Sequence, residues 1–212
     1  MSFHFAPHPH RVLRAGIGML ALTFSGCYSA MPTPTPHDVA PSTIPAPDRR
    51  YTGTVADWPL FFKHHQFAVV CFDTQSCKVE YDEFEFGSDQ ATPSAASLPP
   101  EKYDAAMTAH FGPVPRQAPP ARVVWRCKNG SQLQAYVDID DIFRDGLIRH
   151  NVRREEIPEE ISLGSTHVIL EVDDRTINVY TRTMIPLKEP RNPANPHSDF
   201  RDDLIKVFSR TY

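Results

Sequence analysis

The amino-acid sequence predicts an α+β domain in which an antiparallel sheet of about six strands, arranged as three hairpins, carries two packed helices. Three observations predict this fold class. Short runs rich in β-forming residues follow one another in pairs, two segments have apolar residues at helical spacing, and turn residues separate these elements. A proline-rich tether is expected to precede the domain.

The first predicted hairpin pairs an apolar run, residues 67–72, with residues 77–86, in which charged residues alternate with apolar and aromatic ones. If a short loop joins the two strands, Cys71 and Cys77 lie opposite each other and a disulfide can bridge the neck of the hairpin. The alternative is a bridge from one of them to Cys127, which requires the first two hairpins to be neighbours.

Two further hairpins are predicted from their turns. Residues 122–127 and 131–139 flank Asn129-Gly130, the sequence typical of a type I′ turn. Residues 166–172 and 176–183 flank Asp173-Asp174, and the alternate apolar residues of the first of these strands are expected to face the core. We therefore expect six strands, each paired with its neighbour along the chain.

Two helices complete the predicted domain. Residues 101–111 place apolar and aromatic side chains on one helical face and are followed by Gly112-Pro113, a helix stop signal. Near the end of the chain, Ser198 can cap a helix that runs to about Arg210. Its apolar stripe consists of Phe200, Leu204, Val207 and Phe208.

The first 27 residues have the order of features found in an export signal. Arg11 and Arg14 precede an apolar run, residues 15–24, which is too short to span a bilayer core of roughly 30 Å. Ser25-Gly26 and then Cys27 follow. This segment resembles a bacterial lipoprotein signal peptide, whose lipobox ends in a small residue and an acceptor cysteine.

The resemblance implies that residues 1–26 are removed and that Cys27 carries a diacylglycerol thioether and an N-linked acyl chain, of the palmitate type. The lipid bilayer is then a partner of the chain, because two or more acyl chains anchor stably. Tyr28 follows the cysteine in place of the Asp that retains lipoproteins at the inner membrane, so the outer membrane, facing the periplasm, is expected. The alternative is an ordinary secreted protein with a cysteine near its cleavage site.

Residues 27–50 are expected to form the tether and residues 51–212 a single globular domain. Prolines at every second or third position of the tether favour polyproline II, which can hold the domain up to about 60 Å from the bilayer. The chain has a net charge of -4. Because the signal segment carries two arginines and no acid, the mature chain carries about -6, which argues against a nucleic-acid partner and fits a basic protein partner.

The most enzyme-like segment is Asp138-Ile-Asp140-Asp141-Ile142. It is similar to the Asp-x-Asp loop of haloacid-dehalogenase phosphatases, in which one aspartate attacks phosphorus and the other handles protons beside magnesium. That family has a parallel sheet alternating with helices, whereas an Asn-Gly hairpin leads into this segment. We therefore interpret these acids as turn and cap residues and keep a phosphatase-like hydrolase using Asp138 and Asp140 as the alternative function.

The sequence predicts no metal site and no cofactor. His64 and His65 are adjacent, so their side chains diverge on a strand, and no other ligand lies at suitable spacing nearby. The nucleophile-elbow, zinc-protease and phosphate-loop motifs are absent from the sequence. We therefore predict that the protein is not an enzyme.

The densest acidic segment is the predicted partner-binding surface, with aromatic anchors inside a charged rim. The alternative interpretation is an edge strand whose charges prevent edge-to-edge pairing. The predicted contact residues are Glu80, Tyr81, Asp82, Glu83, Phe84 and Glu85. The predicted function is that of an envelope-anchored lipoprotein whose domain binds a protein, for example as an inhibitor or immunity protein for a toxin or hydrolase that acts on the envelope.

Overall fold

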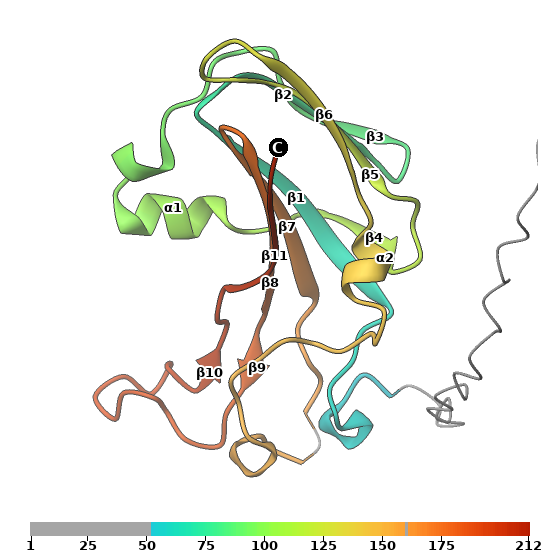
Figure 1. Ribbon diagram of the computed structural model, residues 1–212. Coiled ribbons are helices and arrows are strands. Elements are labelled where there is room, and N and C mark those ends of the chain that lie inside the picture. The colour runs from blue at the N-terminus through green and yellow to red at the C-terminus, as the bar shows by residue number, and fades with distance from the viewer. Residues whose placement is uncertain (1–51, 160) are drawn as a thin grey trace, which may run out of the picture. The chain divides into compact units, whose positions relative to one another are not determined.

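Two β-sheets face each other across a hydrophobic core in the computed structural model, which describes residues 52–159 and 161–212 (Figure 1). The described residues contain eleven strands in three sheets, and the prediction of an α+β fold with two packed helices is therefore wrong. The predicted signal peptide (1–26), tether (27–50) and lipidation site at Cys27 lie outside the described residues. No helix in the described ranges is long and apolar enough to cross a membrane.

The larger sheet has five strands in the order β11-β8-β7-β1-β4. At its centre β1 and β7 run parallel, although about 100 residues separate His65 from its partner Thr166; the other pairs are antiparallel. The strands are β1 (His64–Phe72), β4 (Phe111–Pro115), β7 (Thr166–Asp173), β8 (Thr176–Thr183) and β11 (Ile205–Thr211).

The second sheet is antiparallel and has the order β3-β2-β5-β6. Its strands are β2 (Thr74–Tyr81), β3 (Phe84–Ser88), β5 (Ala121–Cys127) and β6 (Gln132–Val137). A small third sheet pairs β9 (Ile185–Pro186) with β10 (Phe200–Arg201). The remaining elements are α1 (Pro100–Ala106), α2 (Ile139–Ile142), and the 3-10 turns η1 (Val55–Asp57), η2 (Ala95–Ser97) and η3 (Arg154–Glu156).

Both helix predictions need correction. The first predicted helix is real only as α1, which ends at Ala106, and Phe111 belongs to β4 instead. The second, residues 198–210, is wrong, because this segment forms β10 and β11. Its β-branched Ile205 and Val207 suit an extended backbone, and by pairing with β8 the segment saturates hydrogen-bonding groups that would otherwise lie at the edge of the sheet.

The second and third predicted hairpins are confirmed as β5–β6 and β7–β8. In the former, Cys127 N donates to Ser131 O and closes a loop of three residues. Only Gly130 in this loop has a positive φ, 87°, so the turn is not type I′. The first predicted hairpin is wrong, because β1 and β2 belong to different sheets. The chain passes from one sheet to the other at Asp73, whose φ is 50°. β2 pairs instead with β5 and with β3, the second half of the segment predicted as one strand.

The predicted disulfide between Cys71 and Cys77 is present, and its Cα atoms are 6.5 Å apart. Its setting differs from the prediction, because Cys71 is in β1 and Cys77 is in β2, so the bridge joins the two sheets and does not cross the neck of a hairpin. Cys127, the alternative partner, is a buried free thiol whose Sγ lies 3.2 Å from Asn129 Oδ1 and 3.1 Å from Ser131 O, both acceptors for its single S–H.

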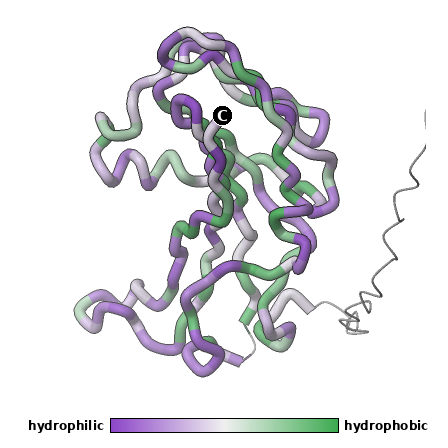
Figure 2. The backbone as a smooth tube through the Cα atoms, viewed as in Figure 1, coloured by the Kyte–Doolittle hydropathy of each residue, from purple (hydrophilic) through white to green (hydrophobic). Residues whose placement is uncertain are grey.

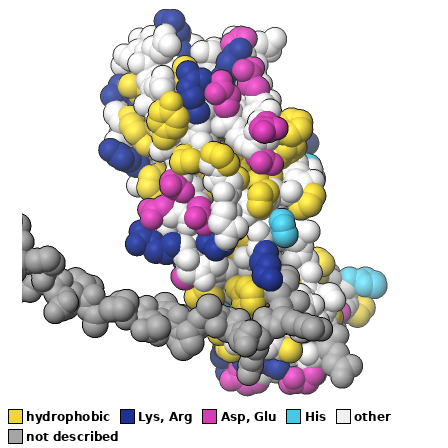
Figure 3. Space-filling view, turned by 90° about the vertical axis from the view of Figure 1, so that its right-hand side faces the viewer, with side chains coloured by type: hydrophobic (Ala, Val, Ile, Leu, Met, Phe, Trp, Pro, Cys, Tyr) yellow, Lys and Arg dark blue, Asp and Glu magenta, His cyan; other side chains and the backbone are white. Residues whose placement is uncertain are grey.

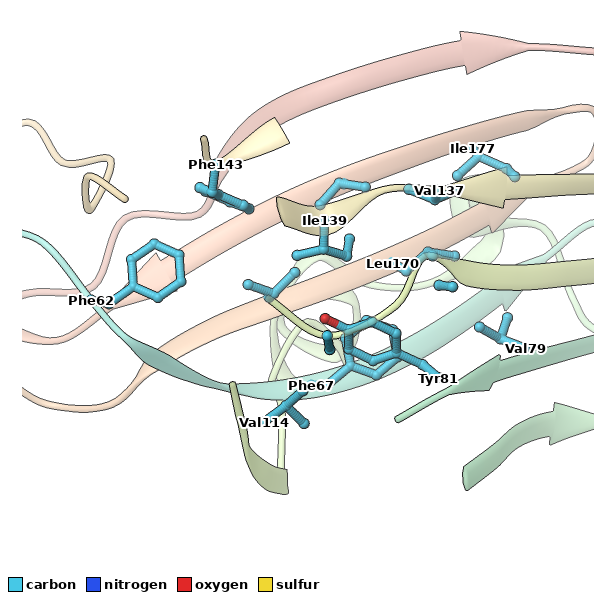
Figure 4. Close-up of a cluster of buried hydrophobic side chains, with 14 of the residues drawn as sticks. Phe62, Phe67, Val79, Tyr81, Val114, Val137, Ile139, Phe143, Leu170 and Ile177 are labelled. Carbon is cyan, nitrogen blue, oxygen red and sulfur yellow. The ribbon is translucent and has the colours of Figure 1, made fainter. Parts of the chain in front are cut away.

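Side chains from both sheets form the core. Val168, Leu170 and Val172 of β7 are fully buried, as their alternation predicts, and Phe67 and Tyr81 lie against each other between the sheets (Figure 4). Trp125 is buried as well, and its indole Nε1 donates to Asp174 O at 2.7 Å. Figure 2 shows hydrophobic residues recurring along the strands, whereas the loops at the lower end of the view are mainly hydrophilic.

The buried carboxylate of Glu171 holds α1 to the face of the larger sheet that points away from the core between the two sheets. Tyr103 Oη of α1 donates to Glu171 Oε2 at 2.7 Å, and Asn178 Nδ2 donates to Glu171 Oε1 at 2.7 Å. Glu171 is almost completely buried. Arg182 of β8 adds a second attachment, since its guanidinium donates to the side chain of Asp104 and to the carbonyl oxygen of Met107.

Candidate functional site

The hairpin formed by β2 and β3 turns at Asp82 and Glu83. Their φ values are 48° and 67°, so both central residues of this two-residue turn have the left-handed conformation of a type I′ turn. Asp tolerates this conformation better than most residues because its short side chain can hydrogen-bond locally. The turn pairs Tyr81 with Phe84 and places both acids at the tip of the hairpin.

Beside this tip, aromatic side chains run from the core to the surface. Phe86 contacts the buried Phe67 and the half-buried Phe111, with ring centroids 5.2 Å and 5.1 Å apart. Phe84 packs against Phe111 at 4.3 Å, yet 55% of Phe84 remains exposed. An aromatic side chain is thus exposed at the point where β3 and β4, the edge strands of the two sheets, come together.

We call the surface formed by this row and its neighbouring acids the acidic–aromatic surface. It consists of Asp82, Glu83, Phe84, Glu85, Phe86 and Phe111. Figure 3 shows acidic side chains next to hydrophobic ones on the face of the molecule that it views. Such a combination is typical of a protein-binding surface, with apolar anchors inside a polar rim.

The charge of this hairpin is strongly negative. Residues 74–89 carry five carboxylates and a single lysine, Lys78. Lys78 Nζ lies 3.3 Å from Asp89 and 3.4 Å from Glu85, and these carboxylates, Asp89 first, raise its pKa. Glu80 pairs with Arg122 at 2.9 Å. Within the described ranges, Asp82 and Glu83 form no ion pair, so their charges are available to a partner.

Tyr81 is placed differently from the other predicted contact residues. Only 2% of it is exposed, and its Oη lies 3.2 Å from Nε2 of His65, which is also buried. Burial lowers the pKa of His65 to about 4, and burial raises the pKa of Tyr81. Tyr81 is therefore a core residue that cannot contact a partner, and it supports the hairpin from inside.

Phe111 is the residue of this surface that the sequence reasoning missed. We expected it on a helix, packed against the sheet, but it begins β4 and contacts Phe84 and Phe86 across the gap between the sheets. One sequence signal could have located the strand, namely Val114 between Pro113 and Pro115. In the structure Val114 is buried and both prolines are exposed. Prolines within an extended run are typical of an edge strand.

Asp138 and Asp140, the residues of the predicted hydrolase alternative, are both bound within the protein. Asp138 Oδ1 caps α2 by accepting from Asp141 N at 2.9 Å. Asp140 Oδ1 lies 2.7 Å from Arg116 Nη1, which also donates to Phe143 O. In the described part of the chain, no group of three His, Cys, Asp or Glu residues is arranged to hold a metal ion.

Among the described residues, the histidines join no group of three potential metal ligands. His64 is exposed and His65 is buried, since they point to opposite faces of β1. His167 accepts a hydrogen bond at Nδ1 from Ala109 N at 3.3 Å, and burial lowers its pKa. His110 is exposed beside it.

A shallow depression lies elsewhere, lined in part by Arg149 and Arg201. Both arginines are already paired, Arg149 with Asp145 and Arg201 with Asp203. Their charges are therefore neutralised within the protein, and the acidic–aromatic surface remains the best candidate site. No protein-family model, curated protein or solved structure matches the chain.

Proposed function

We propose that this chain is an envelope-anchored bacterial lipoprotein whose globular domain binds a protein partner with a basic surface. The observation that carries the proposal is Phe84, an exposed aromatic side chain packed against Phe111 and bordered by the unpaired acids Asp82 and Glu83. In such an arrangement the aromatic ring anchors the partner, while the carboxylates attract basic groups and select against acidic competitors.

Protection of a sheet edge explains this surface less well. Charges or prolines are enough to block edge pairing, and β4 carries exposed Pro113 and Pro115. An exposed phenylalanine adds apolar area at the same place, which increases the risk of association that edge protection reduces. A partner that covers Phe84 accounts for both the apolar ring and the acids around it.

The proposed location follows from the amino-terminal residues. The arginines, apolar run and small residues before Cys27 support cleavage and acylation at that cysteine, and the residue after it, Tyr28, supports the outer membrane, facing the periplasm. A domain held there on a proline-rich tether meets proteins of the envelope. An inhibitor or immunity protein for an envelope-acting toxin or hydrolase fits these features.

The binding proposal is tested with Phe84→Ala and with the double variant Asp82→Asn, Glu83→Gln, using the full-length chain as bait in an envelope extract. Loss of a hot-spot aromatic costs about 2 kcal/mol, or about 30-fold in affinity, so we expect Phe84→Ala to lose the captured partner. The charge variant is expected to capture less partner at low salt and to show a weaker salt dependence.

Phe200→Ala is the matched control, because Phe200 is another partly exposed phenylalanine, in β10. It should capture the same partner as the unmodified chain. Equal capture by the unmodified chain, Phe84→Ala and the charge variant would show that the acidic–aromatic surface is not the binding site.

The anchor is tested separately by labelling cells with palmitate and separating membranes from soluble protein. We expect label on the unmodified chain and none on Cys27→Ala, which should move to the soluble fraction. An exported chain with an unmodified thiol at residue 27 would refute the anchor and leave the binding proposal standing.

A further inference from the structure

The edge strands of the two large sheets differ in how they are protected from further pairing. β4 carries Pro113 and Pro115. β11 carries Lys206 and Arg210 and has a register shift at Lys206. Prolines, charged side chains and irregular register each discourage the addition of another strand.

The two edges of the four-stranded sheet also differ from each other. β3 carries Glu85 and contains Gly87, which has a φ of 105°. β6, with the sequence Gln-Leu-Gln-Ala-Tyr-Val, contains no charged residue, no proline and no glycine. Of the four edge strands of the two large sheets, β6 is therefore the one that lacks these protective features.

The backbone groups that β6 presents at this edge follow from its pairing with β5. Cys127 N donates to Ser131 O at the closed end of the hairpin, and hydrogen-bonded positions alternate along antiparallel strands. Leu133 and Ala135 consequently bond to β5, whereas Gln132, Gln134 and Tyr136 direct their N–H and C=O groups outward. The side chains of these three residues are exposed as well, and 65% of Tyr136 is accessible.

We propose that β6 pairs antiparallel with β6 of a second copy of this chain, with the twofold axis at Gln134. In this register Gln134 lies opposite Gln134 of the second copy, and Gln132 lies opposite Tyr136. Each of these residues has outward backbone groups, so the three pairs exchange about six hydrogen bonds. The two four-stranded sheets then form one continuous sheet.

The side chains suit a second copy as the occupant. The register brings Leu133 beside Ala135 on the inner face, where both copies are apolar, and amide and phenol groups together on the outer face. The carboxamide of Gln134 both donates and accepts, so it can pair with its own copy across the axis. No like charges are brought opposite each other within the strand.

The charges at the two ends of β6 also complement each other in this arrangement. Asp138 directly follows its carboxyl end, and Arg126 of β5 lies opposite Gln132 at its amino end. Both residues are exposed, and neither forms an ion pair within the described ranges. Because the strands are antiparallel, the acidic end of one copy lies next to the basic end of the other. The acidic–aromatic surface is at β3, the other edge of the sheet, so this pairing leaves it free and does not depend on the proposed function.

The register predicts a specific pattern of cross-links in the purified full-length chain. Cα atoms of a hydrogen-bonded pair are about 5.5 Å apart, within the range of a disulfide, so Gln134→Cys should form a covalent dimer under mild oxidation. Gln132→Cys and Tyr136→Cys are the controls: each lies about 14 Å from its own copy, and neither should cross-link alone. A mixture of the two should cross-link. Cys27 and Cys127 are present in every variant and in the unmodified chain, whose cross-linking sets the background.

A second measurement does not depend on oxidation. Gln134→Lys places two ammonium groups on the axis, and we expect the dimer dissociation constant from sedimentation equilibrium to rise at least tenfold, whereas Ala105→Lys, on the exposed face of α1, should not change it. Cross-linking of Gln134→Cys no greater than that of the two controls would overturn the proposal. So would a Gln134→Lys chain that dimerises as well as the unmodified one, or cross-links from residue 134 to another protein in place of a second copy.

Discussion

Reduction of the Cys71–Cys77 disulfide should destabilise the domain, and the number of residues between the two cysteines determines by how much. The cysteines are six positions apart, so the bridge closes a ring of seven residues, and the loop-entropy relation gives about 2.4 kcal/mol. Reduction removes no side-chain atom and adds only one hydrogen to each sulfur. Its effect therefore measures the constraint itself, whereas a substitution would also remove packing around Cys77.

The assay is urea unfolding of the oxidised and reduced chain, followed by tryptophan fluorescence, to which the buried Trp125 and the partly exposed Trp58 contribute. With a urea dependence of about 2 kcal/mol per molar, typical of a domain of this size, we expect the midpoint to fall by about 1.2 M. A Cys71→Ala, Cys77→Ala chain is the control, and its midpoint should not respond to reductant.

A fall of less than about 0.5 M, with alkylation showing both thiols free, would refute this reasoning. That result would mean that the denatured chain already brings β1 and β2 together without the bridge. A change in urea dependence without a change in midpoint would indicate that reduction alters the compactness of the denatured state instead.

Three further predictions concern buried polar groups. Burial lowers the pKa of His65 from 6.5 to about 4, so the stability that neutral His65 contributes is complete above pH 6.5 and is lost as the pH falls to about 4. The variant His65→Phe should therefore remove up to about 3 kcal/mol of the pH dependence of the unfolding free energy, measured by urea unfolding between these two pH values. Tyr103→Phe should lower the unfolding free energy by about 2 kcal/mol, because the buried carboxylate of Glu171 then loses a hydrogen-bond donor. Thr108→Val, the nearby control, should lower the unfolding free energy by less. Arg182→Lys should speed amide hydrogen exchange in α1 about tenfold, and unchanged exchange would show that Arg182 does not hold the helix.

Local sequence signals located the elements whose pairing is local. The hairpins β5–β6 and β7–β8 join adjacent segments through short turns, and alternation identified Val168, Leu170 and Val172 as core residues. The disulfide was predictable for the same reason, since its cysteines are close in sequence. What the sequence did not show is that β1 and β2 part at Asp73 into different sheets.

The errors arose where two periodicities fit one segment or where pairing is distant. Residues 198–210 have apolar residues at helical spacing, but Ile205 and Val207 also alternate along a strand, and only the availability of β8 decides between these structures. The candidate site shows the same limit. Its acids are contiguous in the sequence, but Phe111 reaches Phe84 from another sheet, and Tyr81, which looks exposed by its charged neighbours, is buried.

Because β1 pairs in parallel with β7, the domain cannot be cut into an amino-terminal and a carboxy-terminal fragment that fold independently. β1 is the first strand of the described residues and lies beside β7 in the middle of the five-stranded sheet. A fragment that stops before Thr166 therefore lacks the strand that must cover one side of β1. Contacts between residues so far apart slow folding, because a long loop closes before any pairing energy is gained. The larger sheet therefore cannot assemble progressively as the polypeptide emerges from a ribosome or a translocation pore, and the unfinished chain needs protection from aggregation until nearly all of it has appeared.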